Sequence, residues 1–111
     1  MSSKMFYSSN MAYRLIIKTL AEQDLTYAVE WYAEQSPRLS EPLIRDIDTT
    51  LNTLKDNPHI YQKRYGQVRI AFTQPFPYGI YFTIEENMVY VHAILHTKQR
   101  PQIGLKRIKA E

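Results

Sequence analysis

Residues 78–96, which read YGIYFTIEENMVYVHAILH, contain two stretches of alternating apolar residues separated by a short polar segment. Alternation with a period of two is typical of a β-strand that buries one face. Residues 85–87 form the polar segment and predict a tight turn in which Asn87 takes a positive φ. The stretch therefore predicts an antiparallel β-hairpin. Its buried positions are expected to be Ile80, Phe82, Ile84, Val89, Val91, Ala93 and Leu95.

Residues 13–19 (YRLIIKT) and 67–73 (QVRIAFT) show the same alternation and predict two further strands. In the second of these strands Arg69 is expected to point away from the buried face. The buried set of that strand is expected to be Val68, Ile70 and Phe72.

Between the predicted strands of residues 13–19 and 67–73, the apolar residues recur at helical spacing. This spacing predicts two helices, over residues 21–35 and 40–56. Pro37 ends the first helix, because proline disfavours the α conformation in the residue before it. Ser40 is expected to be the N-cap of the second helix. The link between the helices is short, which favours an antiparallel helical hairpin.

The order β-α-α-β-β-β predicts an α+β fold in which the helical hairpin packs on one face of a four-stranded, mainly antiparallel sheet. The other face of the sheet is expected to be open. Residues 99–109 form a basic tail that is compatible with a short helix. The predicted core comprises Leu25, Val29, Ile47, Leu51, Leu54, Ile80, Phe82, Val89 and Val91.

The chain has 111 residues, of which 44% are hydrophobic, and this predicts one small domain over residues 12–111. The serine-rich residues 1–11 are expected to form a flexible extension, with Met11 as a candidate natural start. There is no cysteine, so disulfides, thiol nucleophiles and thiolate metal sites are excluded. No apolar run approaches the roughly 20 residues that span a bilayer, and we expect a soluble, cytoplasmic protein with no membrane contact. The formal net charge of +3 is compatible with an acidic partner.

The predicted strand alternation places a set of polar and aromatic side chains on the open face of the sheet, together with Gly79. Such groups suit stacking on bases and pairing with phosphates, but an open antiparallel face is polar in any case, so both interpretations remain. His92 and His96 would lie roughly 13 Å apart on a strand, too far to share a metal ion. We therefore expect no metal site, and no motif indicates a cofactor. The open-face set is Arg69, Tyr81, Thr83, Tyr90, His92 and His96.

Several segments in succession resemble the RelE/ParE superfamily of bacterial toxins, and the resemblance extends from residue 13 to residue 101. It rests on the order of these segments together with the predicted secondary structure. The segments are AEQDLTYAVEWY (21–32), IDTTLNTLKDNP (47–58), YGQVR (65–69), FPYGIYFTIEEN (76–87) and VYVHAILHTKQRP (89–101).

This resemblance implies the β-α-α-β-β-β fold and the toxin half of a type II toxin–antitoxin pair, with a cognate antitoxin as its partner. Some relatives cut messenger RNA on the ribosome, and others inhibit DNA gyrase. In the RNA-cutting relatives an arginine follows the aromatic residue at the start of the predicted third strand, and here that position is Gly79. Those relatives also carry a tyrosine near the C-terminus, whereas no Phe, Tyr or Trp follows Tyr90 in this chain.

The resemblance therefore favours a growth inhibitor like ParE, with gyrase as its target. Two alternatives remain: an mRNA endonuclease with a different set of catalytic groups, and a degenerate homologue that only binds its antitoxin. For a nuclease, the candidate catalytic residues are Arg69, His92 and His96. Whether the chain forms a homodimer stays open. The candidate residues for binding a substrate or partner are Lys63, Arg64, Tyr81, Tyr90, Lys98 and Arg100.

Overall fold

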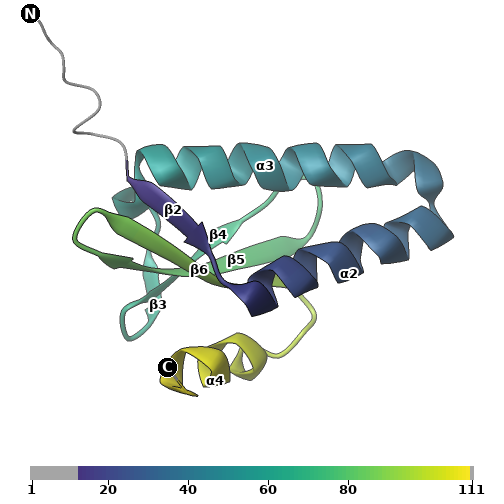
Figure 1. Cartoon of the computed structure of the whole chain (residues 1–111). Helices are drawn as coiled ribbons and strands as arrows, with labels where there is room; N and C mark the ends of the chain where they lie inside the picture. Colours follow the sequence, from purple (N-terminus) through teal and green to yellow (C-terminus); the bar gives the residue numbers. More distant parts are fainter. Residues whose placement is uncertain (1–12, 111) are drawn as a thin grey trace, which may run out of the picture.

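The computed structural model describes residues 13–110, and the element labels follow Figure 1. The extension predicted for residues 1–11 lies outside the described residues. The elements in chain order are β2 (Arg14–Ile17), α2 (Thr19–Gln35), η1 (Pro37–Leu39), α3 (Ser40–Asp56), η2 (Pro58–Ile60), β3 (Lys63–Tyr65), β4 (Val68–Phe72), β5 (Tyr78–Glu85), β6 (Met88–His96) and α4 (Gln102–Ala110).

The described strands form a five-stranded sheet in the order β2-β6-β5-β4-β3. β2 runs parallel to β6, and the other neighbours are antiparallel, which agrees with the mainly antiparallel sheet that was predicted. The predicted strand count of four was one too low, because β3 had not been recognised. β3 has three residues, all exposed, and so it carries no apolar alternation. Gly66, with φ 57°, makes the turn that joins β3 to β4, in a conformation that glycine adopts readily.

Helices α2 and α3 form the predicted antiparallel hairpin on one face of the sheet (Figure 1). All of the predicted core residues pack in the cluster beneath this hairpin, although Leu25 and Val29 are only partly buried. Ser40 is the first residue of α3, and its side chain makes no capping hydrogen bond. The short helix η1 leads directly into α3, so the chain enters the helix already coiled and the predicted N-cap was wrong. Likewise, Glu86 and not Asn87 has the positive φ in the β5–β6 turn.

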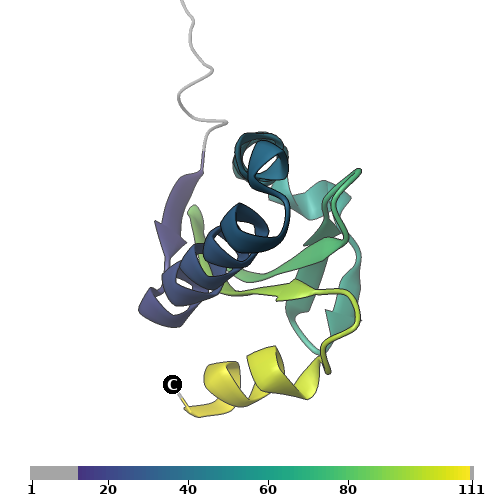
Figure 2. The ribbon, with the colours of Figure 1, turned by 90° about the vertical axis from the view of Figure 1, so that its right-hand side faces the viewer.

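Helix α4 covers part of the sheet face that was expected to be open (Figure 2). Leu105 and Ile108 of α4 pack on a second apolar cluster on that face. Gly104 lies so close to the sheet that an added Cβ would be 3.1 Å from the Cβ of Ala93 and 3.2 Å from a ring carbon of Tyr81. Glycine in a helix costs about 1 kcal/mol relative to alanine, and this close approach is a physical reason for its presence. The second cluster comprises Val68, Ile70, Tyr81, Ala93 and Leu95.

A β-bulge at His92 reverses the alternation of β6. Phe82 pairs with Val91, but the next residue back along β5, Tyr81, pairs with Ala93, so His92 is the extra residue. Past the bulge Ile94 belongs to the core beneath the hairpin. The prediction that Ala93 and Leu95 face the hairpin and that His96 faces away from it was therefore wrong.

The faces of β4 were also assigned the wrong way round. Val68 and Ile70 belong to the cluster under α4, not to the core beneath the hairpin. Arg69 pairs with Phe82, which belongs to the hairpin core, so the arginine lies on the hairpin side of the sheet. Both faces of this strand carry apolar residues, and alternation alone could not tell which set faces the helices.

Asp24 of α2 and Arg107 of α4 form a bidentate ion pair at the edge of β6. The guanidinium nitrogens Nη1 and Nη2 lie 2.7 Å and 3.0 Å from the two carboxylate oxygens. Asp24 also accepts a hydrogen bond from the amide of Ile94, and Arg107 donates one to the carbonyl of His92. The side chains are only 14% and 17% exposed, so the pair is shielded from water and joins α2, β6 and α4.

Replacing Phe82 by alanine should lower the free energy of unfolding by about 3–5 kcal/mol, because the side chain is fully buried and leaves a cavity. Urea unfolding followed by circular dichroism measures this loss. Phe72→Ala is the matched control, since Phe72 is 47% exposed and should cost less. Equal losses in the two variants would contradict the assignment of the core.

Asp24→Asn keeps the shape of the side chain but leaves the charge of Arg107 without its partner. We expect the free energy of unfolding to fall by on the order of 3 kcal/mol, with faster hydrogen exchange in α4. Asp48→Asn is the control, because Asp48 is exposed on α3 and should change stability by less than about 0.5 kcal/mol. If both variants unfold at the same urea concentration, α4 is not held by this ion pair.

Candidate partner-binding site

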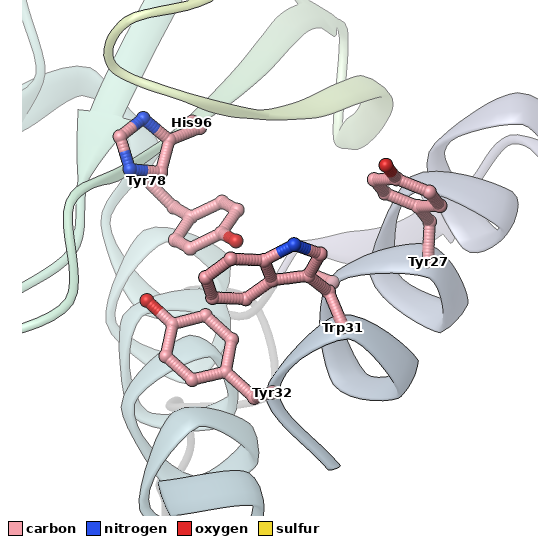
Figure 3. A pocket seen from close by; sticks show the side chains of 6 residues that line it. Tyr27, Trp31, Tyr32, Tyr78 and His96 are labelled. Atoms are coloured by element: carbon pink, nitrogen blue, oxygen red, sulfur yellow. The ribbon is translucent and has the colours of Figure 1, made fainter. Parts of the chain in front are cut away.

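Aromatic side chains from α2, β5 and β6 surround a hollow at one end of the sheet (Figure 3). The hollow has a volume of about 210 Å³. For comparison, an enclosed apolar cavity of about 150 Å³ is large enough to hold benzene. We call this hollow the aromatic pocket. Its lining residues are Tyr27, Ala28, Trp31, Tyr32, Tyr78 and His96.

Helix α2 supplies the outer wall of the pocket. Tyr27 and Trp31 are four residues apart, so they lie on the same side of the helix. They are 71% and 47% exposed, respectively, whereas Ala28 between them is buried in the core. Trp31 also packs edge-on against Tyr32, with ring centroids 5.1 Å apart. Two large apolar side chains are thus held at the surface by a helix whose opposite side is anchored in the core.

The inner wall depends on the loop between β4 and β5. Asp46 of α3 accepts hydrogen bonds from the amides of Gln74 and Phe76, and this fastens the loop to the hairpin. Phe76 packs edge-on against Tyr32, with ring centroids 5.5 Å apart. The loop delivers Tyr78 as the first residue of β5, at the base of the pocket.

His96 closes the pocket from the end of β6. Its ring packs edge-on against Tyr78, with centroids 5.4 Å apart. The amide of Lys98 donates to Nδ1 of His96 at 3.1 Å, so in the neutral ring the proton belongs on Nε2. The amide of His96 donates to the side chain of Gln99, which fixes the turn that follows.

The pocket is apolar but carries hydrogen-bond donors. Burial, together with the nearby hydroxyls of Tyr32 and Tyr27, raises the pKa of Tyr78 to about 12. A tyrosine hydroxyl is protonated at neutral pH whether or not its pKa is raised, and Figure 3 shows the hydroxyl of Tyr78 directed toward the indole of Trp31. Phenol hydroxyls and an indole N–H can donate to a ligand, and no carboxylate from residues 13–110 lines the pocket. This chemistry suits an apolar side chain accompanied by a hydrogen-bond acceptor.

The three residues proposed for catalysis lie in separate surroundings. Arg69 donates to the carbonyl of Tyr61 at 2.6 Å and contacts Nδ1 of His59 at 3.4 Å, so its guanidinium supports the segment before β3. His92 is 5% exposed on the α4 side, where its Nε2 lies 2.8 Å from the hydroxyl of Thr83. His96 lies across the sheet in the aromatic pocket. The prediction that these three residues share one face of the sheet was therefore wrong.

The structure disperses the six residues proposed for binding. Tyr81 is buried under α4, and burial raises the pKa of its hydroxyl. Tyr90 lies on the same face, with the ammonium of Lys18 5.8 Å from its ring centre.

Lys63 and Arg64 are exposed on β3, which is the edge strand of the sheet. Strand β4 separates β3 from β5 and β6, the strands that line the pocket. The guanidinium of Arg64 stacks 5.3 Å from the ring centre of Phe72. Lys98 and Arg100 are exposed in the turn after β6, and this turn starts at His96 of the pocket.

The packing around position 79 explains why it is a glycine, and the sequence alone did not reveal this. An added Cβ would lie 3.0 Å from a methyl carbon of Ile70 and 3.3 Å from the ring of Phe72. The ring of Phe72 therefore occupies the space beside the glycine, as aromatic side chains do next to glycines in sheets.

Four aromatic residues of the pocket were missed by the sequence analysis. The sequence analysis gave no binding role to Tyr27, Trp31, Tyr32 or Tyr78. One signal was present: Tyr27 and Trp31 fall outside the apolar stripe that buries α2. Large apolar residues on the exposed side of an amphipathic helix indicate a surface for a partner.

None of the helices in the described part of the chain is both long and apolar enough to cross a membrane. No group of three or more His, Asp or Glu side chains within residues 13–110 is arranged to hold a metal ion.

The fold, a helical hairpin on a mainly antiparallel sheet with a C-terminal helix on the other face, is that of the RelE/ParE superfamily of type II toxins. The family described as the ParE toxin of the type II toxin–antitoxin system parDE matches residues 15–101. This match covers most of the sequence, and the chain belongs to the ParE toxin family.

A solved structure described as "Chromosomal ParDE TA system from P. aeruginosa" is similar to this fold, with a TM-score of 0.70. The similarity covers 79% of this chain and 99% of that chain at 16% sequence identity, a level at which it concerns the fold alone. The comparison with curated protein sequences gave no match.

The raised pKa of Tyr78 predicts a loss of stability at high pH. The pKa is about 12 in the folded protein and 10.0 in an unperturbed tyrosine, so at a pH between these values only the unfolded chain releases the proton. The proton of Tyr78 therefore contributes its full stabilisation of the folded state below pH 10, and this contribution is lost as the pH rises toward 12. The free energy of unfolding should fall by up to about 3 kcal/mol over this range.

Tyr78→Phe should flatten the fall in the free energy of unfolding over this range, because phenylalanine has no proton to release. Urea unfolding of both proteins at several pH values above about 9 measures the two slopes. Identical slopes would show that the Tyr78 hydroxyl titrates in the folded protein as it does in the unfolded chain.

Proposed function

We propose that this ParE-family toxin arrests bacterial growth by inhibiting DNA gyrase, without cutting RNA, and that a cognate antitoxin neutralises it by binding to its surface. The family match supports an antitoxin as the partner, and so does the similarity to a solved structure described as a ParDE TA system. A gyrase target and an antitoxin partner both imply that the protein acts in the cytoplasm.

The dispersal of Arg69, His92 and His96 is the observation that favours gyrase over RNA. A ribonuclease needs cations near the scissile phosphate and a group that takes the proton of the attacking 2′-hydroxyl, all within reach of one nucleotide. Here the guanidinium of Arg69 binds the carbonyl of Tyr61, His92 is buried, and His96 lies on the other side of the sheet from His92. These groups cannot converge on a single phosphate.

Two assays on the purified full chain test the proposal: inhibition of gyrase supercoiling and cleavage of mRNA on ribosomes. We expect inhibition of supercoiling and no cleavage. In cells, expression of the chain alone should slow growth, and co-expression of the product of an adjacent antitoxin gene should restore it. A chain that never slows growth would support the alternative of a degenerate homologue.

Two substitutions separate the proposal from a ribonuclease with other catalytic groups. Arg69→Gln keeps a donor near the carbonyl of Tyr61, and His92→Asn keeps a polar group near Thr83. We expect gyrase inhibition to survive both changes, after thermal unfolding has shown that the variants are folded. Ribosome-dependent cleavage by the unaltered chain that falls by about 10²-fold or more in either variant would establish the ribonuclease instead.

A further inference from the structure

The outward side of α2 carries an unbalanced negative charge. The helix contains four acidic residues and no Lys or Arg. Asp24 bonds to Arg107, whereas the other three acidic residues are exposed: Glu22, Glu30 and Glu34. The chain as a whole has a formal net charge of +3, so this side of α2 is an acidic exception on a basic protein.

Two of these carboxylates are placed where they destabilise the helix. Glu30 and Glu34 are four residues apart, a spacing at which like charges repel each other. Glu34 also lies in the last turn of α2, which has no basic residue, and negative charge at this end opposes the helix dipole. A bound cation would relieve both repulsions. Local arrangements that weaken the free protein in this way are typical of functional sites.

The acidic residues lie beside the aromatic pocket. Glu30 and Glu34 follow Tyr27 by three and seven residues, so they lie next to its ring on the same side of the helix. The ring of Tyr27 lines both the aromatic pocket and a second hollow of about 390 Å³. We call these two hollows, together with Glu34, the α2 face. The second hollow is lined by Thr19, Glu22, Gln23, Thr26, Tyr27 and Glu30.

A partner that fits the α2 face combines two properties. The aromatic pocket has space for one large apolar side chain, and the hydroxyl of Tyr78 can donate to a carbonyl beside that side chain. The carboxylates on the other side of Tyr27 favour Lys or Arg, and these cations also interact favourably with the faces of aromatic rings. A basic segment that carries one large apolar residue meets both requirements.

The positions of the charges also fix how such a segment lies. The exposed cations Lys98 and Arg100 follow His96 on the β6 side of the aromatic pocket. The basic residues of the segment are repelled from that side and attracted to the α2 side, where Glu30 and Glu34 lie. The segment therefore crosses the ring of Tyr27, with its apolar residue in the pocket and its cations beyond the ring.

Charge also indicates which partner supplies this segment. A partner that covers most of the basic chain is expected to be acidic, whereas the α2 face selects the opposite charge. The proposed target is an enzyme that binds DNA, and DNA-binding proteins present Lys and Arg to the phosphates. Exposed basic segments are therefore a property of the target.

We infer that the α2 face binds a basic segment of the target, which inserts one large apolar side chain into the aromatic pocket and places Lys or Arg against Glu30 and Glu34. This inference rests on the proposed function and names the surface through which the toxin reaches gyrase. The ring of Tyr27 lies between the two parts of the bound segment and contacts both.

The first test measures binding of the full chain to purified DNA gyrase by calorimetry at low and high salt. The double substitution Glu30→Gln and Glu34→Gln should weaken binding by at least about tenfold and reduce its dependence on salt, because it removes two attractive charges. The same variant should unfold at a urea concentration no lower than the unaltered chain, because it also removes two repulsions within α2. Loss of binding without loss of stability distinguishes contact with the target from a structural role.

The matched control for charge is the double substitution Asp48→Asn and Glu85→Gln. It removes two exposed carboxylates from α3 and from the end of β5, outside the α2 face. This variant should bind gyrase within about twofold of the unaltered chain.

Tyr27→Ala tests the aromatic part of the α2 face. It should weaken binding by at least about tenfold, and alanine keeps the helix intact. Tyr65→Ala, which removes an exposed ring from β3, is its control and should bind normally. A photoreactive p-benzoylphenylalanine in place of Tyr27 should cross-link to gyrase, and mass spectrometry should identify a segment rich in Lys and Arg. The same group in place of Tyr65 should not cross-link to that segment.

Each contrary outcome has a distinct meaning. If the chain inhibits gyrase while the Glu30, Glu34 and Tyr27 variants bind normally, the α2 face is not the contact, although the proposed function stands. A cross-linked segment without Lys or Arg also overturns the inference. Binding through these residues that leaves supercoiling unaffected would uphold the inference and defeat the proposed function.

Other partners would give results of their own. A cross-link from position 27 between two copies of the chain, with none to gyrase, would assign the α2 face to a second copy. Weaker binding of the antitoxin by the three substitutions, with unchanged affinity for gyrase, would assign it to the antitoxin. Both results overturn the inference. If the chain neither binds nor inhibits gyrase, both proposals fail.

Discussion

The ion pair between Asp24 and Arg107 takes the place of a missing strand. β2 pairs with β6 only from Met88 to Val91, and past that point the edge of β6 would expose its backbone polar groups. The carboxylate accepts from one of these groups and the guanidinium donates to another, while the two side chains bind each other. An unsatisfied buried backbone group costs about 1–3 kcal/mol, so this contact protects the sheet edge and fixes α2 and α4 on its two sides. The position of α2 in turn sets the outer wall of the aromatic pocket.

Local sequence patterns were sufficient for the elements that bury one clear apolar face. The β5–β6 hairpin, the helical hairpin and the core beneath it were predicted because Phe82, Leu51 and their neighbours follow a period of two or 3.6. The same reasoning failed where the period breaks. The bulge at His92 has no signature in the residues around it, and every assignment beyond it was reversed. β4 carries apolar residues on both faces. Val68 and Ile70 are apolar because α4 packs on their side of the sheet.

The candidate site was harder to predict than the fold, because it depends on which side chains meet. The basic and aromatic residues chosen from the sequence were assumed to share one open face, but α4 covers part of that face and the bulge moves His96 to the other. Gly79 illustrates the same difficulty. Its departure from the ribonuclease pattern suggested a missing catalytic group, and the structure adds that Ile70 and Phe72 fill the space beside it. A residue with a β-carbon at this position would have to displace them.

The separation of 83 residues between Asp24 and Arg107 also sets the order in which the protein can be completed during synthesis. A chain emerging from the ribosome folds its N-terminal parts first, and residue 107 follows the whole of the sheet. Until Arg107 has emerged, the edge of β6 past Val91 lacks its bonding partner and the apolar cluster of Val68, Ile70 and Tyr81 lacks the cover of α4. Until α4 has been synthesised, the nascent chain thus exposes an unpaired strand edge and an uncovered apolar face of the sheet. Translation that stops before residue 107 leaves a product prone to aggregation and degradation.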